Sequence, residues 1–237
     1  MSSLPYPFLR ETFLNALEES GSACSESGWD PIHLTLEDGE TSCFMPLYLK
    51  DHSMGEYVFD HAWANAYHQN GLEYYPKLVT AVPFTPSTGT RLRSNTAMSQ
   101  QHCRQIVDEV INIAEDTHAS SWHILFPEDN DLKLFDDPRL LKRTGVQYHW
   151  LNKDYQCFND YLAGMTSRKR KMIKKERDEI KKQNIEVDVL LGSEISKEIW
   201  QLFYQLYERT YAKRNGTRGY LTQEFFERIA TTMPEQI

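Results

Sequence analysis

Ionisable and aromatic side chains crowd into one stretch, residues 56–77, and these types suit a pocket that binds a polar substrate and moves a proton. The stretch holds Glu56, Tyr57, Asp60, His61, Trp63, Tyr67, Tyr74, Tyr75 and Lys77. A carboxylate there can take the proton that an attacking amine must lose, while rings and hydrogen bonds hold a polar substrate. We therefore predict Glu56 or Asp60 as the base, with Tyr67 returning a proton to the leaving group. The predicted substrate-binding residues of this stretch are Trp63, Tyr74, Tyr75 and Lys77.

A structural role is the alternative for the same residues. The rings of Trp63, Tyr67 and Tyr75 could belong to the core. Glu56 and Asp60 could cap or solvate the helix that follows them. The two interpretations differ in where the carboxylates point.

A second candidate site is the polar loop Val82 to Arg93 (VPFTPSTGTRLR). It follows a β-prone apolar run at residues 74–82 and precedes a run of helical periodicity at residues 99–117. A loop that leaves a strand and opens a helix offers free N–H groups and the helix dipole to an anion. We predict that it binds the phosphates of a donor through Thr85, Thr88, Gly89 and Arg91. Pro83 and Pro86 have no N–H to donate, so a structural turn is the alternative.

The third candidate is a basic run at residues 166–183, TSRKRKMIKKERDEIKKQ, with nine Lys and Arg against three acids. An apolar stripe of Leu162, Met165, Met172, Ile173 and Ile180 predicts a helix that packs by one side and exposes its charge. A solvated helix face is the default interpretation. The alternative is that its cations, with Arg168 and Lys171 as predicted substrate-binding residues, meet a nucleotide-linked precursor, an aminoacyl-tRNA or anionic lipid.

Several other classes of function find no support in the sequence. His61 and His68 lie seven residues apart without a carboxylate or cysteine to complete a set, so no metal site is expected. No G-x-S-x-G elbow surrounds a serine. The four cysteines are scattered and no run is long and apolar enough for a membrane span, which favours a reducing cytoplasm. The net charge of −8 argues against bulk coating of nucleic acid.

The elements that must position these residues follow an α/β order. We expect a helix from Phe8 to Leu17, a hairpin of residues 32–37 and 42–49 around Asp38-Gly39, and a short strand at 57–60 leading into an aromatic-rich helix. The strand at 74–82, the helix at 99–117, a strand at 122–126, a short helix at 131–135 and a last strand at 146–151 follow. From Phe158 we expect one long helix, a strand at 185–191, and helices at 195–213 and 222–231.

Several long strings, in order, resemble a bacterial family of predicted N-acyltransferases related to the Fem-type peptidoglycan aminoacyltransferases. They are PLYLK from Pro46, GEYVFDHAWANAY from Gly55, GLEYYPKLVTAVPFTPSTGTRLR from Gly71, HILFP from His123, RTGVQYHW from Arg143 and SRKRKMIKKER from Ser167. The resemblance covers nearly the whole chain.

The resemblance implies a GNAT-like α/β fold, with a mixed central sheet flanked by helices. It implies a first GNAT-like domain at residues 1–155 and the start of a second at 156–237, which ends inside that domain. The implied activity transfers an acyl or aminoacyl group from acyl-CoA or aminoacyl-tRNA to an amine of a cell-wall precursor, with no permanently bound cofactor. The alternatives are a non-catalytic module that recognises an envelope precursor, or a nucleic-acid binder that acts through the basic helix.

Overall fold

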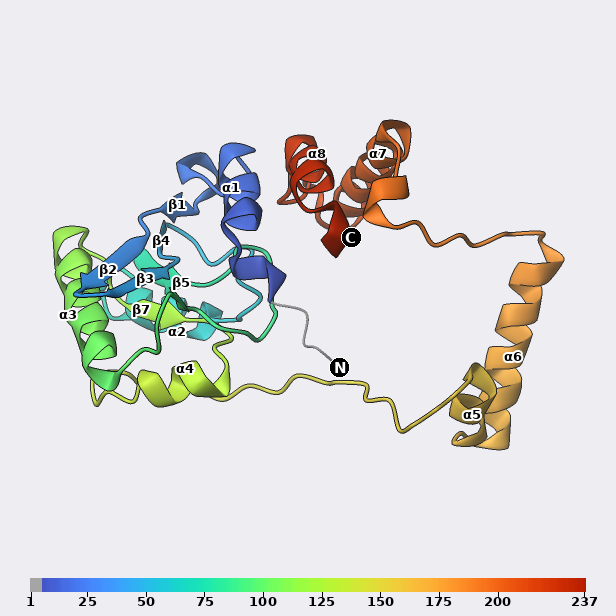
Figure 1. Ribbon diagram of the computed structural model, residues 1–237, viewed down its shortest axis with the longest axis horizontal. Helices are drawn as coiled ribbons and strands as arrows, with labels where there is room; N and C mark the ends of the chain where they lie inside the picture. The colour runs from blue at the N-terminus through green and yellow to red at the C-terminus, as the bar shows by residue number, and fades with distance from the viewer. Residues whose placement is uncertain (1–5) are drawn as a thin grey trace. The chain divides into compact units, whose positions relative to one another are not determined.

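The computed structural model describes residues 6–237, which form two compact units (Figure 1). Unit 1 comprises the described chain up to Leu140 together with Leu191–Ile237, and unit 2 is Leu141–Leu190. Each unit is described below by itself.

Unit 1 contains all the strands of the described chain and most of its helices. The strands are β1 (Asp30–Pro31), β2 (Leu34–Asp38), β3 (Thr41–Met45), β4 (Tyr48–Lys50), β5 (Lys77–Thr80), β6 (Arg93–Ser94) and β7 (Trp122–Ile124). The α-helices are α1 (Glu11–Glu19), α2 (His61–Gln69), α3 (Gln100–Asp116), α4 (Asp129–Leu134), α7 (Lys197–Asn215) and α8 (Gln223–Thr232). Short 3₁₀ turns occur at Pro7–Leu9, Ser25–Ser27, Gly192–Glu194 and Pro234–Gln236.

The strands form two sheets. One has the order β1-β4-β5-β7, in which β4 is antiparallel to β1 and β5, and β5 is parallel to β7. The other is antiparallel, with the order β2-β3-β6. The predicted hairpin around Asp38-Gly39 is confirmed as β2 and β3, whose turn uses a left-handed Gly39. Its second strand, expected at residues 42–49, ends at Met45, and Tyr48–Lys50 form β4 of the other sheet.

Helices cover both faces of the mixed sheet. On one face, Cys103, Ile106 and Val110 of α3 join a core cluster that includes Leu78 of β5. On the other face, α1 and α8 join a second cluster that includes Val79 of β5. Because both faces of the sheet are covered and neighbouring residues of a strand point to opposite faces, all four residues of β5 are buried. This mixed sheet flanked by helices is consistent with the predicted GNAT-like fold.

The C-terminal helices belong to unit 1. The ring of Phe225 on α8 packs edge-on against Phe13 of α1, with ring centroids 5.8 Å apart. The backbone N–H of Thr222 donates to Ser22 Oγ at 3.0 Å. The compact units therefore do not follow the expected boundary at residue 155. That residues 156–237 begin a second GNAT-like domain stays a prediction.

Unit 2 holds α5 (Phe158–Ala163) and α6 (Ser167–Lys182). The expectation of a single helix from Phe158 was wrong. Helix α5 ends before Gly164, and α6 begins after Thr166, whose side chain caps it. In the part of the chain that the structure describes, no helix has the length and apolar character to cross a membrane.

Three expected strands, at residues 57–60, 146–151 and 185–191, were also wrong: within the described chain these segments are not strands. At 57–60 the left-handed φ of 58° at Tyr57 and the start of α2 after Asp60 interrupt any extended run. The other two segments alternate apolar and polar residues, yet Val146 and Val189 are each 86% exposed. Alternation of apolar and polar residues shows which side chains share a face of a strand, but it does not specify a neighbouring strand. Neither segment pairs with one within residues 6–237.

Candidate functional site

A buried cluster of charges lies where β4 and β5 run side by side. Lys50 on β4 is paired directly with Lys77 on β5 in the antiparallel register. Opposed residues of such a pair project from the same face, so two ammonium groups enter the interior together. Both side chains are fully buried, and so are Glu56 and Asp60 from the segment that joins β4 to α2. We call these four residues, with Ser53 and Tyr74, the lysine–carboxylate cluster.

Lys77 is the centre of this cluster. Its Nζ donates to Glu56 Oε2 at 2.9 Å, to Asp60 Oδ2 at 2.6 Å and to Ser53 Oγ at 2.8 Å. An ammonium group has three N–H donors, so all of them are used. Buried charges are tolerated only when paired and hydrogen-bonded in this way.

Lys50 has a different environment. Its Nζ donates to the carbonyl oxygens of Gly28 at 3.1 Å and Met54 at 3.4 Å, and lies 3.6 Å from the centroid of the Trp29 ring. The nearest carboxylate oxygen, Glu56 Oε1, is 4.0 Å away. Burial lowers the pKa of Lys50 to about 7, although the charge of Glu56 opposes this change.

The two carboxylates differ in their electrostatics. Burial raises the pKa of Glu56 above its ordinary value, and the attraction of Lys77 and Lys50 offsets this only in part. Burial acts on Asp60 too, but hydrogen bonds from Lys77, Tyr74 and Ser53 outweigh it and lower the pKa of Asp60. Tyr74 Oη and Ser53 Oγ donate to Asp60 Oδ2 at 2.7 and 2.8 Å. Asp60 is thus held as an anion, whereas Glu56 is the carboxylate closer to exchanging a proton.

Each carboxylate keeps one oxygen without a hydrogen bond. Among the described residues, Glu56 Oε1 and Asp60 Oδ1 are buried and have no hydrogen-bond partner. Most buried side-chain oxygens in native proteins are satisfied, so such atoms call for an explanation. They are the two carboxylate oxygens of the cluster that remain without a donor.

Aromatic side chains border the cluster as the sequence predicted. The ring of Tyr74 lies edge-on to Tyr67 and to Tyr75, with centroids 5.2 and 5.0 Å apart. Tyr75 Oη is 2.8 Å from Ser53 Oγ. Trp63, on the neighbouring turn of α2, is 52% exposed. The structure therefore brings Tyr67, Tyr74 and Tyr75 to one place with Glu56, Asp60 and Lys77.

A comparison with protein-family models shows to which family this chain belongs. The model of a FemAB-like family, described as peptidoglycan biosynthesis/recognition, matches residues 2–237. The chain belongs to the FemAB-like family. No curated protein and no solved structure matches it.

In this FemAB-like chain the capping alternative for Asp60 fails. Asp60 does occupy the residue before α2, where a capping side chain would stand. Its side chain makes no capping hydrogen bond, because Oδ2 is already taken by the donors of the cluster. Lys77 and Tyr74 donate to this carboxylate in place of the backbone N–H groups at the start of α2.

Two members of the cluster, Lys50 and Ser53, were missed by the sequence analysis. Lys50 follows Leu49 in the strand PLYLK, at the same inward parity as Tyr48. A lysine at an inward position of a strand is a signal, because a buried ammonium requires a carboxylate partner. Ser53 carries no comparable pattern.

The polar loop of the FemAB-like chain is organised by its own arginine. Arg91 is fully buried and its guanidinium donates to the carbonyl oxygens of Ser87 (2.7 Å), Leu125 (2.8 Å), Thr90 (2.9 Å) and Gly89 (3.1 Å). Asp131 Oδ2 accepts the backbone N–H of Arg91 at 2.5 Å. The cation thus points into the loop and holds its backbone in place.

The premise of a loop that opens directly into a helix was wrong. Strand β6 pairs with β3 after the loop, and α3 begins only at Gln100. The first free N–H groups of α3 are met by its own cap, in which Ser99 Oγ accepts from His102 N at 3.1 Å. Thr88 is exposed, and Thr85 Oγ1 donates to the carbonyl oxygen of Pro83 at 3.0 Å. The donor-binding role of the loop stays a prediction.

The loop nevertheless packs on the segment that carries Glu56. A Cβ placed on Gly55, which has a φ of 80°, would lie 2.6 Å from the ring of Phe84. Phe84 itself has a left-handed φ of 57°, an uncommon conformation for an aromatic residue. The loop and the lysine–carboxylate cluster therefore share one packing contact.

The two remaining predicted binding residues lie elsewhere. Arg168 and Lys171 are exposed residues of α6 in unit 2. Their predicted role is independent of the cluster geometry. Among the described residues, no group of three His, Cys, Asp or Glu side chains is arranged to hold a metal ion.

Proposed function

We propose that this FemAB-like protein is an N-acyltransferase that acts in peptidoglycan biosynthesis on an amine of a cell-wall precursor. The observation that carries the proposal is Glu56, a buried carboxylate with a raised pKa and one oxygen free of hydrogen bonds. A general base works best when its pKa approaches the working pH and a bound substrate can reach it. Membership of a family described as peptidoglycan biosynthesis/recognition supports the choice of acceptor.

In the proposed step, the amine nitrogen attacks the carbonyl carbon of an activated acyl group. The new C–N bond forms while the C–S bond of a CoA thioester, or the C–O bond of an aminoacyl-tRNA ester, breaks. The proton of the amine passes to Glu56 Oε1, and the leaving sulfur or oxygen takes a proton from Tyr67. Glu56 then gives up its proton to solvent and the Tyr67 phenolate takes one from solvent, so that both groups regain their starting states. No covalent intermediate with the enzyme forms, and orientation of the two substrates supplies much of the acceleration.

The other cluster residues have positioning roles in this proposal. Lys77 holds Glu56 by the opposite oxygen and leaves Oε1 free of hydrogen bonds for the substrate amine. Asp60, kept as an anion, balances the charge of Lys77 and offers Oδ1 as a second acceptor to the substrate amine. Tyr74 and Tyr75 line the site. Both candidate donors are compounds of the cytoplasm, and the proposal places the reaction there.

The test is an isosteric change of the proposed base. The protein is incubated with labelled acetyl-CoA, or with a mixture of aminoacyl-tRNAs, and a UDP-linked muramoyl pentapeptide, and the product is detected by mass spectrometry. Glu56→Gln keeps the shape of the side chain but cannot take a proton, and we expect a loss of about 100-fold or more in turnover. Asp51→Asn changes an exposed carboxyl in the same segment between β4 and α2; it is the matched control and keeps full activity.

Two results contradict the proposal. If Glu56→Gln turns over as fast as the Asp51→Asn control, then Glu56 is not the base. If the wild-type protein binds the muramoyl peptide in a calorimetric titration but transfers no group from either donor, the protein is a recognition module.

A further inference from the structure

Unit 2 combines positive charge with exposed apolar side chains. Residues 141–190 contain twelve Lys and Arg against seven Asp and Glu, a net charge of +5, whereas the whole chain carries −8. The same residues include these exposed large apolar side chains: Leu141, Val146, Tyr148, Trp150, Leu151, Phe158, Met172, Ile180, Ile185, Val187, Val189 and Leu190. A solvated surface accounts for the charge but not for so many uncovered apolar groups.

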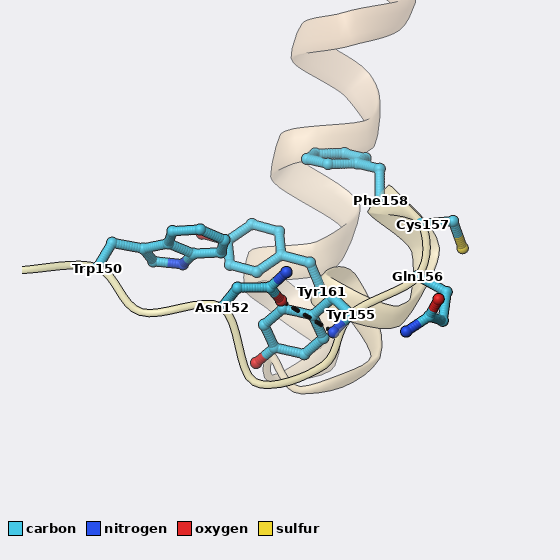
Figure 2. Close-up of a pocket in the computed structure, with 7 residues that line it drawn as sticks. All are labelled: Trp150, Asn152, Tyr155, Gln156, Cys157, Phe158 and Tyr161. Carbon is cyan, nitrogen blue, oxygen red and sulfur yellow. Dashed lines mark hydrogen bonds between the residues drawn. The ribbon is translucent and has the colours of Figure 1, made fainter. Parts of the chain in front are cut away.

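Two members of this set, Trp150 and Phe158, line one open pocket of about 430 Å³ together with Tyr155 and Tyr161 (Figure 2). Trp150 lies nearly parallel to Tyr155 and edge-on to Tyr161, with ring centroids 6.4 and 6.0 Å apart. Phe158 at the start of α5 is 5.7 Å from Tyr161. Asn152, Gln156 and Cys157 complete the lining.

The aromatic pocket adjoins the basic helix. The guanidinium carbon of Arg177 on α6 lies 4.2 Å from the centroid of the Phe158 ring. On the helix itself, Met172, Ile173 and Ile180 share one arc, and most of the cations occupy the rest of the circumference. Cations, aromatic rings and aliphatic side chains therefore meet in one short unit.

This combination matches the chemistry of a membrane surface. Lys and Arg are attracted to anionic headgroups, Trp and Tyr favour the interfacial layer, and aliphatic side chains enter the acyl boundary. A single-stranded nucleic acid would use the cations and the rings. It would leave Val146, Val187 and Val189 in water, and these side chains decide between the two partners.

We propose that unit 2 is a docking surface for an anionic lipid bilayer. The basic face of α6 supplies the electrostatic attraction, and Trp150 with the flanking aliphatic residues supplies the apolar contact. The surface holds the protein on the membrane without crossing it, and it does so whether or not the lysine–carboxylate cluster is catalytic.

The test is co-sedimentation of the full chain with vesicles of phosphatidylcholine alone and of phosphatidylcholine with phosphatidylglycerol in equal parts. We expect binding to the anionic vesicles only, and weaker binding as salt is added. Changing three exposed cations of α6 together, Lys174→Gln, Lys175→Gln and Lys181→Gln, should weaken it about 100-fold, at roughly five-fold for each charge near the surface. The matched control changes Lys197, Lys213 and Arg214 of α7 to Gln and leaves binding unchanged.

A second pair of variants tests the apolar contact. Trp150→Ala should weaken vesicle binding at least ten-fold, because a large interfacial ring is lost. Leu202→Ala, an exposed apolar residue of α7, should have no effect. Far-UV circular dichroism of every variant establishes that the helices remain.

Four outcomes overturn the proposal. The first is absence of binding to the anionic vesicles at low salt, and the second is an equal loss of vesicle binding in the α6 and α7 variants. The third is displacement of the bound protein by a polyuridine RNA at a lower concentration than by anionic vesicles. The fourth is a self-association of the chain that Trp150→Ala abolishes.

Discussion

Removal of the Lys77 ammonium tests the lysine–carboxylate cluster most directly. The change Lys77→Met keeps the length of the side chain but leaves Glu56 and Asp60, which are 3% and 0% exposed, without their main cation. Breaking a buried ion pair by removing one partner costs about 3–5 kcal/mol. Lys50 remains 4.0 Å from Glu56, and Tyr74 and Ser53 still donate to Asp60, so we expect the lower part of that range. The loss is a large fraction of a typical unfolding free energy of about 5–15 kcal/mol.

The loss should depend on pH in a definite direction. Without Lys77 the two carboxylates are buried and poorly compensated, so their folded-state pKa values rise above the unfolded values of about 4. A group whose folded pKa is raised contributes stability at low pH that is lost as pH rises through the folded pKa. The variant should therefore lose less stability at pH 5 than at pH 8, by about 1.4 kcal/mol per pH unit for each carboxyl protonated only in the folded state.

The assay is guanidinium unfolding at several pH values. Lys133→Met, which removes an exposed ammonium from α4, is the control and should change the unfolding free energy by less than about 0.5 kcal/mol. The triple variant Lys77→Met, Glu56→Gln, Asp60→Asn should recover part of the loss, because no buried carboxylate remains charged, although Lys50 then loses the carboxylate nearest to it. A loss below about 1 kcal/mol for Lys77→Met, or an equal loss at pH 5 and pH 8, refutes the reasoning about the cluster.

Two further predictions concern the loop that packs on the cluster. Gly55→Ala places a methyl group 2.6 Å from the ring of Phe84 at a φ of 80°, and we expect thermal unfolding to show a loss of about 1–3 kcal/mol. Gly71→Ala, with a φ of 70° but no atom within 4 Å, should lose only about 1 kcal/mol, and equal losses would exclude the packing contact. Burial raises the pKa of Asp131 to about 6. The free energy of unfolding of the wild type should therefore fall by on the order of 3 kcal/mol as pH rises from 4 to 7, because the buried carboxyl then loses its proton. Asp131→Asn should flatten that dependence in urea unfolding, and an unchanged slope would show that Asp131 does not titrate in this range.

Local patterns were sufficient for the elements whose partners lie near in sequence. The hairpin of β2 and β3 follows from alternation on both sides of a glycine turn, and α3 follows from apolar residues at helical spacing. The sequence also singled out Glu56, Asp60, Tyr74 and Lys77 as one group, and the structure brings these side chains together, while their catalytic and binding roles stay predictions. Each of these features depends on neighbours that the chain itself brings close.

Long-range pairing was outside the reach of the same patterns. The alternating runs at 146–151 and 185–191 have the period of strands but no partner, because a period does not specify which edge a segment joins. Gly164, where α5 ends, is a local helix-stop signal. The apolar stripe of residues 162–180 favoured one continuous helix instead.

The sequence by itself determined the family resemblance, the α/β order of unit 1 and the group of residues predicted to support the acylation of an amine. The tertiary structure alone decided how the charges are used. The β4–β5 register sets Lys50 beside Lys77 although 27 positions separate them, and Arg91 turns inward onto the carbonyl groups of its own loop. The physical reason is desolvation: a buried charge takes whichever partners the folded backbone brings within about 3 Å, and that choice is made only when distant strands pair.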